Sequence, residues 1–344
     1  MRYIGETMRP DSCWISENAA NGHVNTTGLT GSGKSVRGNR MELEAAKEGT
    51  TVIAIDINRG HAEGMIFPPM EAEYSSFSNR IDVKEDGLNL EFLKPIQGSD
   101  GRMEDAVSLI NSMVYAIGSP SKLGIRQRGA LREAVIFALR NRPAFPDEMT
   151  AVGYGLLQQD NPAAKGVYEK LWMVINSKIF RPGDKYLKRG AINIISFCGM
   201  DKLTQATFVE ILLSNLWRTA QYQGNIMGGD ILLTIDEYQN LSLKEGAVLR
   251  DILREGRKFG INLLLTTQTL RVFPRDTLAI LNQAGTRLYF RPQVDEIRST
   301  AREIDSQNVE HWVRVLQSLR RGEAVAVGSF NVGGREVNHP LVTR

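Results

Sequence analysis

The sequence predicts an α/β protein whose mainly parallel β-sheet is wrapped by helices. Short apolar runs suited to strands recur at 51–57, 191–197, 230–236, 261–267, 286–290 and 323–330. Their hydrophobicity is continuous rather than alternating, which is typical of strands covered on both faces. Helical periods such as 204–221 and 243–256 lie between several of these runs, so we expect a doubly wound core.

Between residues 103 and 189 the pattern changes to successive helices with almost no strand signal. The first helix has one apolar face, formed by Ala106, Val107, Ile110, Met113, Val114 and Ile117. Because strand signals resume at residue 191, we interpret this stretch as an insertion within one α/β domain. The predicted organisation is an α/β core of residues 1–102 and 190–344, with an inserted all-α subdomain of residues 103–189.

The composition is that of a globular protein with a weak net charge. Its 344 residues are 42% hydrophobic, and 42 Lys+Arg against 39 Asp+Glu give a charge of +3. Any nucleic-acid contact must then come from local clusters of cations. The two cysteines, Cys13 and Cys198, have no CxxC spacing, which argues against a zinc site or a disulfide framework. No apolar run approaches the roughly 20 residues of a membrane span, so we expect a soluble, cytoplasmic protein.

Residues 28–35, GLTGSGKS, match the phosphate-loop pattern G-x-x-x-x-G-K-[ST]. The glycines let the backbone turn its N–H groups toward phosphate oxygens, and the helix that begins near Lys34 adds its positive dipole end. Lys34 would bridge the β- and γ-phosphates, and the Ser35 hydroxyl would hold Mg²⁺. The predicted nucleotide-binding residues are Gly28, Thr30, Gly31, Ser32, Gly33, Lys34, Ser35 and Val36. The preceding segment, HVNTTG, is unusually polar for a strand.

The second half of the site is predicted where DILLTIDEYQN ends an apolar strand with Asp236 and Glu237. Asp236 can accept hydrogen bonds from water on Mg²⁺, and Glu237 can orient and deprotonate the attacking water. The pair therefore predicts nucleotide hydrolysis, although it could instead cap the next helix. Asp56 also ends a strand, and the sequence leaves both a structural and a functional role open for it.

The two ends of the strand 261–267 carry different predicted roles. The strand is about 23 Å long, so its ends cannot serve the same phosphate. Gln268 follows the carboxyl end, where ligands bind in open α/β sheets, and could sense the γ-phosphate or position water. Arg257 lies at the opposite edge and could act as an arginine finger on a neighbouring subunit, with Lys258 as the alternative. Arg257 could also be an ordinary cation at a helix C-terminus.

The order of GLTGSGKS, IDEYQN, EGRKFGINLLLTTQ and AGTRLYFR resembles the FtsK–HerA superfamily of hexameric translocating ATPases, most closely its HerA-like branch. The segment 192–217 also looks like that family's strand and helix before the Walker B acid. The resemblance spans about residues 20–330 and implies a RecA-like P-loop NTPase core, ATP and Mg²⁺ as ligands, and a homo-oligomeric ring. It also implies that Arg257 completes the neighbour's site and that Gln268 is a sensor.

The resemblance has limits that affect the expected partners. Only 27 residues precede Gly28, so we do not expect the N-terminal β-barrel of HerA proper. We also expect neither the transmembrane region of secretion coupling proteins nor a C-terminal DNA-reading domain of the FtsK kind. We therefore expect a bare motor, which would need a partner to reach a membrane.

The resemblance further implies a polymer threaded through a central pore. Two segments carry several cations that could contact a phosphate backbone without reading base sequence. Aromatic side chains among the cations could stack on exposed bases. The first has Lys178, Arg181, Lys185, Lys188 and Arg189 beside Phe180 and Tyr186, and the second has Arg126, Arg128, Arg132, Arg140 and Arg142. Both could instead be solvated faces. Arg287 and Arg291 could be further sensors, or could form salt bridges with Asp295 or Glu296.

Taken together, these features predict a Mg²⁺-dependent ATPase that hydrolyses ATP at the subunit interfaces of a ring, expected to be a hexamer, to translocate or pump DNA. One alternative is a motor that moves protein or nucleoprotein through a secretion or conjugation channel in a membrane. Another is an ATP-regulated ring that serves as a scaffold for a partner nuclease or defence effector.

Overall fold

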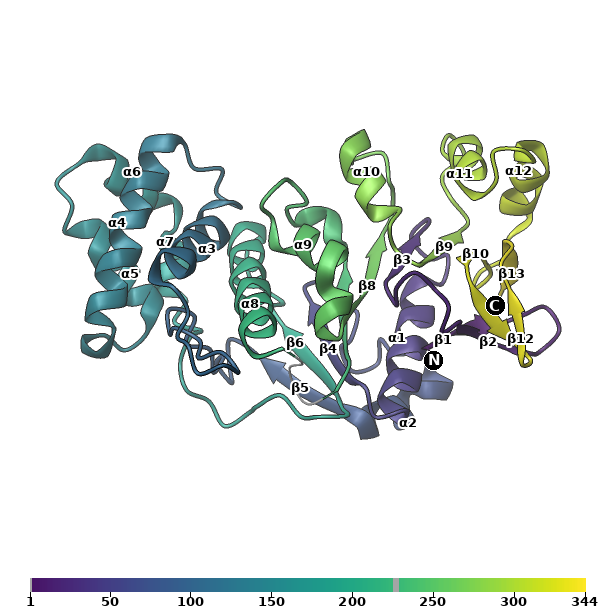
Figure 1. The fold of residues 1–344 in the computed structure, drawn as a ribbon, viewed down its shortest axis with the longest axis horizontal. Helices are drawn as coiled ribbons and strands as arrows, with labels where there is room; N and C mark the ends of the chain where they lie inside the picture. The colour runs from purple at the N-terminus through teal and green to yellow at the C-terminus, as the bar shows by residue number, and fades with distance from the viewer. Residues whose placement is uncertain (1, 225–228) are drawn as a thin grey trace.

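The computed structural model describes residues 2–224 and 229–344, and its centre is a large β-sheet with helices on both faces (Figure 1). The strand order is β13 (Leu341–Thr343), β10 (Ala324–Gly328), β9 (Thr286–Phe290), β3 (Val24–Thr27), β8 (Ile261–Thr267), β7 (Ile231–Asp236), β4 (Thr51–Asp56), β6 (Ile192–Ser196) and β5 (Ser78–Asp82). From β9 to β5 every neighbouring pair is parallel, whereas β10 is antiparallel to β9 and β13. The predicted α/β class with a mainly parallel sheet is therefore confirmed.

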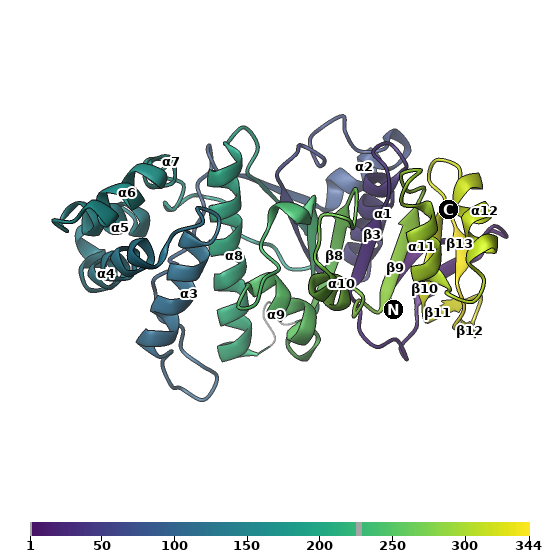
Figure 2. The same cartoon turned by 90° about the horizontal axis from the view of Figure 1, so that it is seen from above.

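Some helices cover the middle of the large sheet, and others lie at the two ends of the molecule (Figure 2). They are α1 (Lys34–Lys47), α2 (Pro68–Phe77), α3 (Ala106–Gly118), α4 (Ile125–Asn141), α5 (Glu148–Leu157), α6 (Pro162–Lys170), α7 (Trp172–Asn176), α8 (Lys202–Gln223), α9 (Val248–Glu255), α10 (Arg275–Leu281), α11 (Ile297–Ile304) and α12 (Val309–Ser318). Figure 2 shows α3–α7 gathered at one end, beyond α8, and α11 and α12 at the other. None of the described helices is long and apolar enough to cross a membrane.

The helices α3–α7 follow one another between β5 and β6, in the stretch where the sequence predicts an insertion. Side-chain caps define where three of them begin: Asp105, Asp147 and Asn161 each accept a hydrogen bond from a backbone N–H of the first turn. Their apolar side chains join the same hydrophobic cluster as one face of the sheet. The division of the chain into a core and a subdomain stays a prediction.

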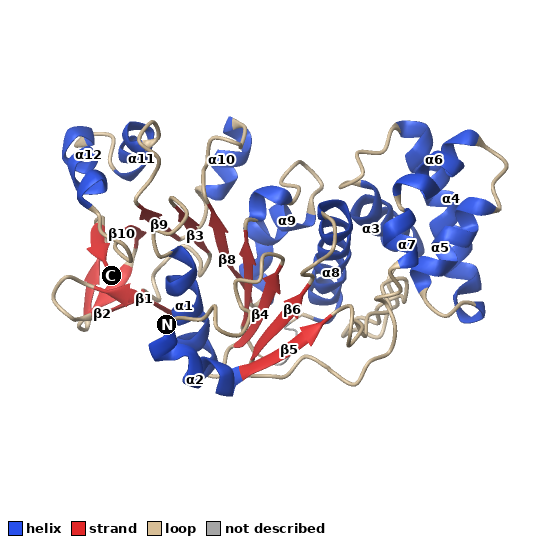
Figure 3. Cartoon of the chain, turned by 180° about the vertical axis from the view of Figure 1, so that it is seen from behind, coloured by secondary structure: helices blue, strands red, loops and turns tan. Residues whose placement is uncertain are grey.

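Alternate side chains of the central strands point into two different hydrophobic cores. On β4, Val52 and Ala54 pack in a cluster with residues of α1 and α2. Ile53 and Ile55 pack on the other face, in a cluster that includes residues of α8 and α9. Figure 3 shows the strands as a layer between these two pairs of helices. Both faces are covered, which explains why apolar residues form continuous rather than alternating runs in β4, β7 and β8.

The polar segment before the phosphate-loop pattern forms β3, which lies near the middle of the sheet with all four residues buried. Asn25 Oδ1 accepts a hydrogen bond of 3.1 Å from the Tyr238 hydroxyl, and His23 Nδ1 accepts one of 3.0 Å from the Leu263 N–H. These bonds offset the cost of burying polar side chains. Specific tertiary partners, rather than hydrophobicity, therefore make this strand possible.

A second, smaller sheet lies beside the large one and was not predicted. Its antiparallel strands are β1 (Arg2–Glu6), β2 (Ser12–Ile15), β11 (Phe330–Val332) and β12 (Arg335–Val337). The predicted run 323–330 is divided between β10 and β11. A bridge between Thr7 and Thr343 links the small sheet to β13. Figure 1 shows that both ends of the described chain lie near α1.

Candidate functional site

The phosphate-loop residues connect the carboxyl end of β3 to the start of α1, and three glycines shape the turn. Gly28, Gly31 and Gly33 have φ values of 154°, 78° and 109°, a region that side chains disfavour. A Cβ on Gly28 would lie 2.6 Å from Phe290 Cβ, and one on Gly33 would lie 2.8 Å from the Gly322 Cα. The loop therefore requires glycine for its conformation and for its close packing on β9 and on Gly322, in the turn before β10.

The backbone of this loop is suited to an anion. Within residues 2–224 and 229–344, we find no hydrogen-bond acceptor for the N–H groups of Gly31, Gly33 and Lys34. The Lys34 N–H is the first of α1, where the helix dipole also favours negative charge. Unpaired N–H groups around a glycine turn form a cradle for phosphate oxygens. The residues present therefore fit a nucleotide phosphate chain.

The Lys34 side chain is folded back onto this loop. Its Nζ donates hydrogen bonds to the carbonyl oxygens of Gly28, at 2.7 Å, and Leu29, at 3.0 Å. Burial lowers the pKa of Lys34, while the nearby carboxylates of Asp236 and Glu237 oppose that effect. Both bonds go to neutral acceptors, so a phosphate oxygen would be a stronger partner for the ammonium group.

A cavity of about 150 Å³ brings most of the predicted site residues together. It is lined by Thr30, Gly31, Gly33, Lys34, Ser35, Val36, Asp236, Glu237, Gln268 and Arg321. Gly28 and Ser32 of the predicted set shape the loop but do not line the cavity. Arg321 was not predicted, because nothing in its local sequence distinguishes it from the other arginines.

The two acids lie opposite the loop, at the carboxyl end of β7. Burial and the neighbouring charge of Glu237 raise the pKa of Asp236 to about 6, against the opposing effects of the Glu237 N–H and Lys34. The carboxylate of Asp236 and the hydroxyl of Ser35 line the same cavity, and such oxygens are the ligands that Mg²⁺ prefers. The predicted metal ligands therefore share one cavity with the phosphate loop.

Two amide side chains hold the Glu237 carboxylate. Gln268 Nε2 donates a hydrogen bond of 2.7 Å to Glu237 Oε1, and Gln239 Nε2 donates one to the other carboxylate oxygen. Glu237 itself has a φ of 53°, in the left-handed region that is uncommon for residues other than glycine. Strain of this kind is found at functional sites. The arrangement fits a carboxylate held in a fixed orientation to accept a proton.

Asp56 belongs to a buried polar network behind the site and does not line the cavity. Its Oδ1 accepts a hydrogen bond of 3.0 Å from the Gly60 N–H and lies 4.0 Å from His61 Nδ1. His61 Nε2 lies 3.2 Å from both carboxylate oxygens of Glu42, which also accepts a bond of 2.5 Å from the Tyr74 hydroxyl. Of the two roles left open by the sequence, these contacts favour the structural one.

Arg257 lies in a 3-10 helix, Gly256–Phe259, immediately before the amino end of β8. It is exposed, and its guanidinium donates a hydrogen bond to the Ala20 carbonyl oxygen. Lys258 forms a 3.1 Å ion pair with Glu255. The strand separates Arg257 from Gln268, as expected. Within the described part of the chain, Arg257 contacts no residue that lines the nucleotide cavity of its own subunit, so its role on a neighbouring subunit stays a prediction.

Several of the residues considered for DNA contact have structural partners. Phe180 is only 5% exposed, and its ring packs 4.8 Å from that of Phe92, so the idea that it stacks on bases is wrong. Arg181 donates hydrogen bonds to backbone carbonyl oxygens, and Lys185 forms a 2.9 Å ion pair with Asp86. The exposed members of this segment are Lys178, Lys185, Tyr186, Lys188 and Arg189.

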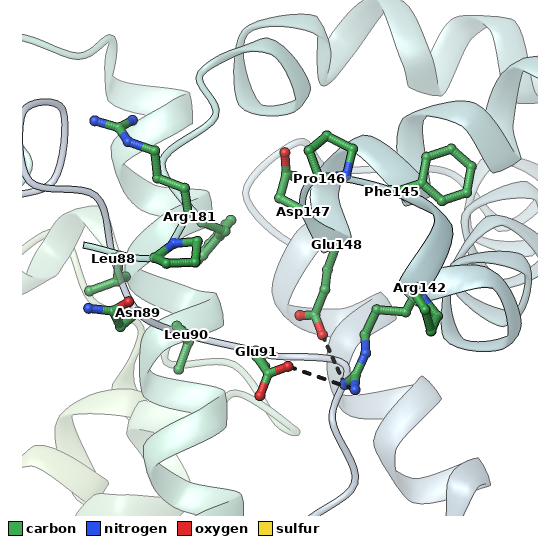
Figure 4. A pocket seen from close by; sticks show the side chains of 13 residues that line it. Leu88, Asn89, Leu90, Glu91, Arg142, Phe145, Pro146, Asp147, Glu148 and Arg181 are labelled. Atoms are coloured by element: carbon green, nitrogen blue, oxygen red, sulfur yellow. Dashed lines mark hydrogen bonds and ion pairs between the residues drawn. The ribbon is translucent and has the colours of Figure 1, made fainter. Parts of the chain in front are cut away.

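Arg142, from the second group of cations, lies at a wider cavity of about 570 Å³ that is separate from the phosphate loop. Figure 4 shows this cavity between the start of α5 and the segments 88–91 and 180–182. Arg142 lies 3.4 Å from Glu148 and 3.7 Å from Glu91. Burial raises the pKa of Glu148 to about 7. These contacts make Arg142 part of a local ion-pair network rather than a free cation.

Arg291 forms no ion pair with Asp295 or Glu296 in the described structure, where both carboxylates pair with Arg271. The carbonyl oxygen of Arg291 instead accepts a 2.9 Å hydrogen bond from the Leu29 N–H of the phosphate loop. Arg291 also lines a cavity of about 230 Å³ beside that loop, which we call the outer cavity. The salt-bridge interpretation is therefore wrong for Arg291.

Comparison with solved structures identifies the fold. VirB4 of Thermoanaerobacter pseudethanolicus superposes on all of the chain and on 96% of its own, with a TM-score of 0.73 and 14% sequence identity. The protein has the VirB4 fold. The conjugative coupling protein TrwB, in a form complexed with sulphate, superposes on all of the chain and on 89% of its own, with a TM-score of 0.64 and 12% identity.

These likenesses agree with the predicted RecA-like P-loop core and with the resemblance to the FtsK–HerA superfamily. They rest on structure alone, because the chain matches no protein-family model and no curated protein sequence. At such low identity the shared property is the fold, and any role for individual residues must be argued from the site itself.

Proposed function

We propose that this protein is an ATPase that hydrolyses ATP at the subunit interfaces of a homo-oligomeric ring and uses the energy to translocate or pump DNA. The observation that carries the proposal is the single cavity shared by Lys34, Asp236, Glu237 and Gln268. It combines a phosphate cradle with a carboxylate held by two amides. These are the groups that phosphoryl transfer to water requires.

The nucleotide is proposed to be ATP, with Mg²⁺. TrwB, which has the same fold, has been solved in complex with the ATP analogue ADPNP and with ADP and Mg²⁺. In this chain Ser35 and Asp236 would hold the metal ion, which when bound would neutralise phosphate charge. TrwB has also been solved with the GTP analogue GDPNP, so GTP is a second substrate to test.

The chain's own residues suggest how hydrolysis proceeds. Lys34 would leave the two loop carbonyls that it now contacts and place its ammonium group against the phosphate chain. Glu237 would accept a proton from the attacking water, with Gln268 and Gln239 keeping its carboxylate oriented. The raised pKa of Asp236 would fall again beside a cation, because opposite charge favours the ionised carboxylate.

A ring explains the position of Arg257. This residue precedes the amino end of β8, whereas the phosphate loop lies at the carboxyl ends of the strands. It therefore cannot reach the nucleotide of its own subunit. In a ring the same edge could face the nucleotide of the next subunit, where a guanidinium would stabilise charge on the transferred phosphoryl group. We propose a hexamer by resemblance to the FtsK–HerA superfamily.

DNA is the proposed polymer, contacted without sequence preference through exposed cations such as Lys188 and Arg189. A second candidate is a motor that moves protein or nucleoprotein through a conjugation channel, and the likeness to the conjugative coupling protein TrwB favours it. DNA stimulation of ATP turnover would favour the first function. Stimulation only by a channel or other partner protein would favour the second, or a scaffold ring for a nuclease.

A subunit-mixing experiment tests the proposal. An Arg257→Ala subunit would keep a complete nucleotide cavity but lack the arginine finger. A Glu237→Gln subunit would keep the arginine finger but lack the catalytic carboxylate. We expect both variants to be inactive alone and the mixture to recover ATP turnover, with Lys258→Ala active throughout as the matched control. Turnover by a monomer that tolerates Arg257→Ala would show that no neighbour completes the site. The readout is steady-state phosphate release, with oligomeric state followed by light scattering.

A further inference from the structure

The turn between α12 and β10, Arg320–Gly322, packs directly against the phosphate loop. The Gly322 N–H donates a hydrogen bond of 2.7 Å to the Ser32 carbonyl oxygen. A Cβ on Gly33 would lie 2.8 Å from both the Cα and the nitrogen of Gly322, so the two backbones are in close contact. The position of this turn is therefore coupled to that of the residues that cradle phosphate.

A buried arginine of α1 fixes the turn more firmly. Arg37 Nη2 donates a hydrogen bond of 2.8 Å to the Gly322 carbonyl oxygen. Its Nη1 donates to the Ile4 carbonyl oxygen at 2.6 Å and to Thr343 Oγ1 at 3.1 Å. One guanidinium thus ties α1, β1, β13 and the turn together, one helical turn after Lys34. Because Arg37 is buried, these bonds are worth more than similar bonds at the surface.

Arg321 belongs to this fixed turn and borders the proposed nucleotide cavity. It lines the cavity together with Lys34, Glu237 and Gln268. It is exposed, and none of the ion pairs found among the described residues involves it. The neighbouring Arg320 lines the outer cavity and is not among the residues that line the nucleotide cavity. The two adjacent arginines therefore differ in that only Arg321 lines the cavity that also contains Glu237.

Arg321 lies among other cations at the loop tip, so an anion beside it is favoured. Arg291, Arg320 and Arg321 all line the outer cavity, and no carboxylate pairs with any of them within the described ranges 2–224 and 229–344. Like charges that are held together repel one another. A phosphate group beside Arg321 would relieve this repulsion and give its planar guanidinium two acceptors.

We infer that Arg321 contacts the terminal phosphoryl group of the nucleotide bound to its own subunit. It would act in cis, on the same group that Arg257 of a neighbour reaches in trans. The inference rests on the proposed function, since it presumes a nucleotide on the phosphate loop. The terminal group is assigned because Arg321 shares the cavity with Glu237 and Gln268, which lie where the attacking water would be held.

The test compares Arg321→Gln with Arg320→Gln. Both substitutions remove one exposed guanidinium from the same turn, and neither side chain makes a hydrogen bond in the described structure. We expect Arg321→Gln to lower kcat on the order of 100-fold and to weaken binding of a non-hydrolysable ATP analogue while leaving ADP affinity unchanged. Arg320→Gln should stay within about twofold of wild type in each measurement, and Arg321→Lys should recover part of the loss. Equal behaviour of the two glutamine variants would overturn the inference.

Mixing subunits then separates action in cis from action in trans. If Arg321 acts in cis, a mixture of Arg321→Gln with Glu237→Gln stays inactive, because each subunit has one incomplete cavity. Recovery of turnover would show that Arg321 serves the neighbour and would overturn the assignment. Failure of the proposed function looks different: wild type would then not hydrolyse ATP, and Lys34→Ala would leave nucleotide binding unchanged.

Discussion

Gln268 donates a 2.7 Å hydrogen bond to Glu237, and this bond joins the carboxyl ends of two adjacent parallel strands. The register of β7 on β8 pairs Asp236 with Thr266, which brings the residues that follow each strand to the same edge of the sheet. A glutamine at this position can orient the Glu237 carboxylate and can also contact a ligand bound beside it. The bond therefore gives a physical meaning to the sensor role that the resemblance implies.

Replacing Gln268 with alanine should lower kcat on the order of 10- to 100-fold while changing nucleotide affinity little. The substitution frees one oxygen of Glu237, so the carboxylate is no longer held in one orientation, while Lys34 and the loop are untouched. Steady-state turnover and binding of a fluorescent nucleotide measure the two effects separately. Gln293→Ala, on the exposed surface, serves as the control. Normal turnover in Gln268→Ala would rule out an orienting role.

Replacing Gly33 with alanine should abolish nucleotide binding and lower the free energy of unfolding by about 1–3 kcal/mol. The new Cβ would collide with the Gly322 backbone at 2.8 Å, at a φ of 109° that side chains avoid. Gly31→Ala is the matched control, since its φ is 78° but no atom lies within 4 Å of the added Cβ. Chemical denaturation and nucleotide titration measure both variants. Equal destabilisation would mean that backbone strain, rather than contact with Gly322, limits this loop.

The sequence predicted those parts of the site that are encoded locally. The phosphate loop is a continuous motif, and Asp236, Glu237 and Gln268 each follow an apolar strand, so parallel strand order places them at one edge. Apolar runs and helical periods likewise predicted the sheet and its covering helices. Each of these features depends on neighbours in the chain and on one rule about parallel sheets.

The remaining features depend on contacts between distant segments. Arg321 reaches the cavity because the Gly322 backbone is bonded to Ser32, a contact that no local pattern encodes. The strand β3 can be polar because the buried Tyr238 hydroxyl donates a hydrogen bond to Asn25. Phe180 looked like a base-stacking residue beside cations, yet it packs in the core. In each case tertiary packing decides what the local composition leaves open.

Buried Glu210 should make stability depend on pH. Burial raises the pKa of Glu210 to about 7 from an ordinary value of 4.5, while a 3.1 Å hydrogen bond from the Ser242 N–H opposes the shift. The folded state therefore holds a proton that the unfolded state has released, so stability falls as pH rises from about 4.5 to 7 and stays lower above that range. Glu210→Gln should remove this dependence and raise the free energy of unfolding at pH 8 by about 1–3 kcal/mol. Denaturant titrations at pH 4.5 and 8 measure it, and an unchanged difference between them in the variant would contradict the assignment.

Charge reversal at Lys188 and Arg189 should reduce stimulation of ATP turnover by double-stranded DNA without changing turnover in its absence. Both side chains are exposed and lie far along the chain from the phosphate loop, whereas Lys185 is engaged with Asp86. Each lost phosphate contact should also reduce the salt dependence of DNA binding by about one unit of slope. Arg335→Glu, an exposed cation of β12, is the matched control. If Lys188→Glu/Arg189→Glu binds DNA with the wild-type salt dependence, the polymer touches another surface, or the motor moves protein instead.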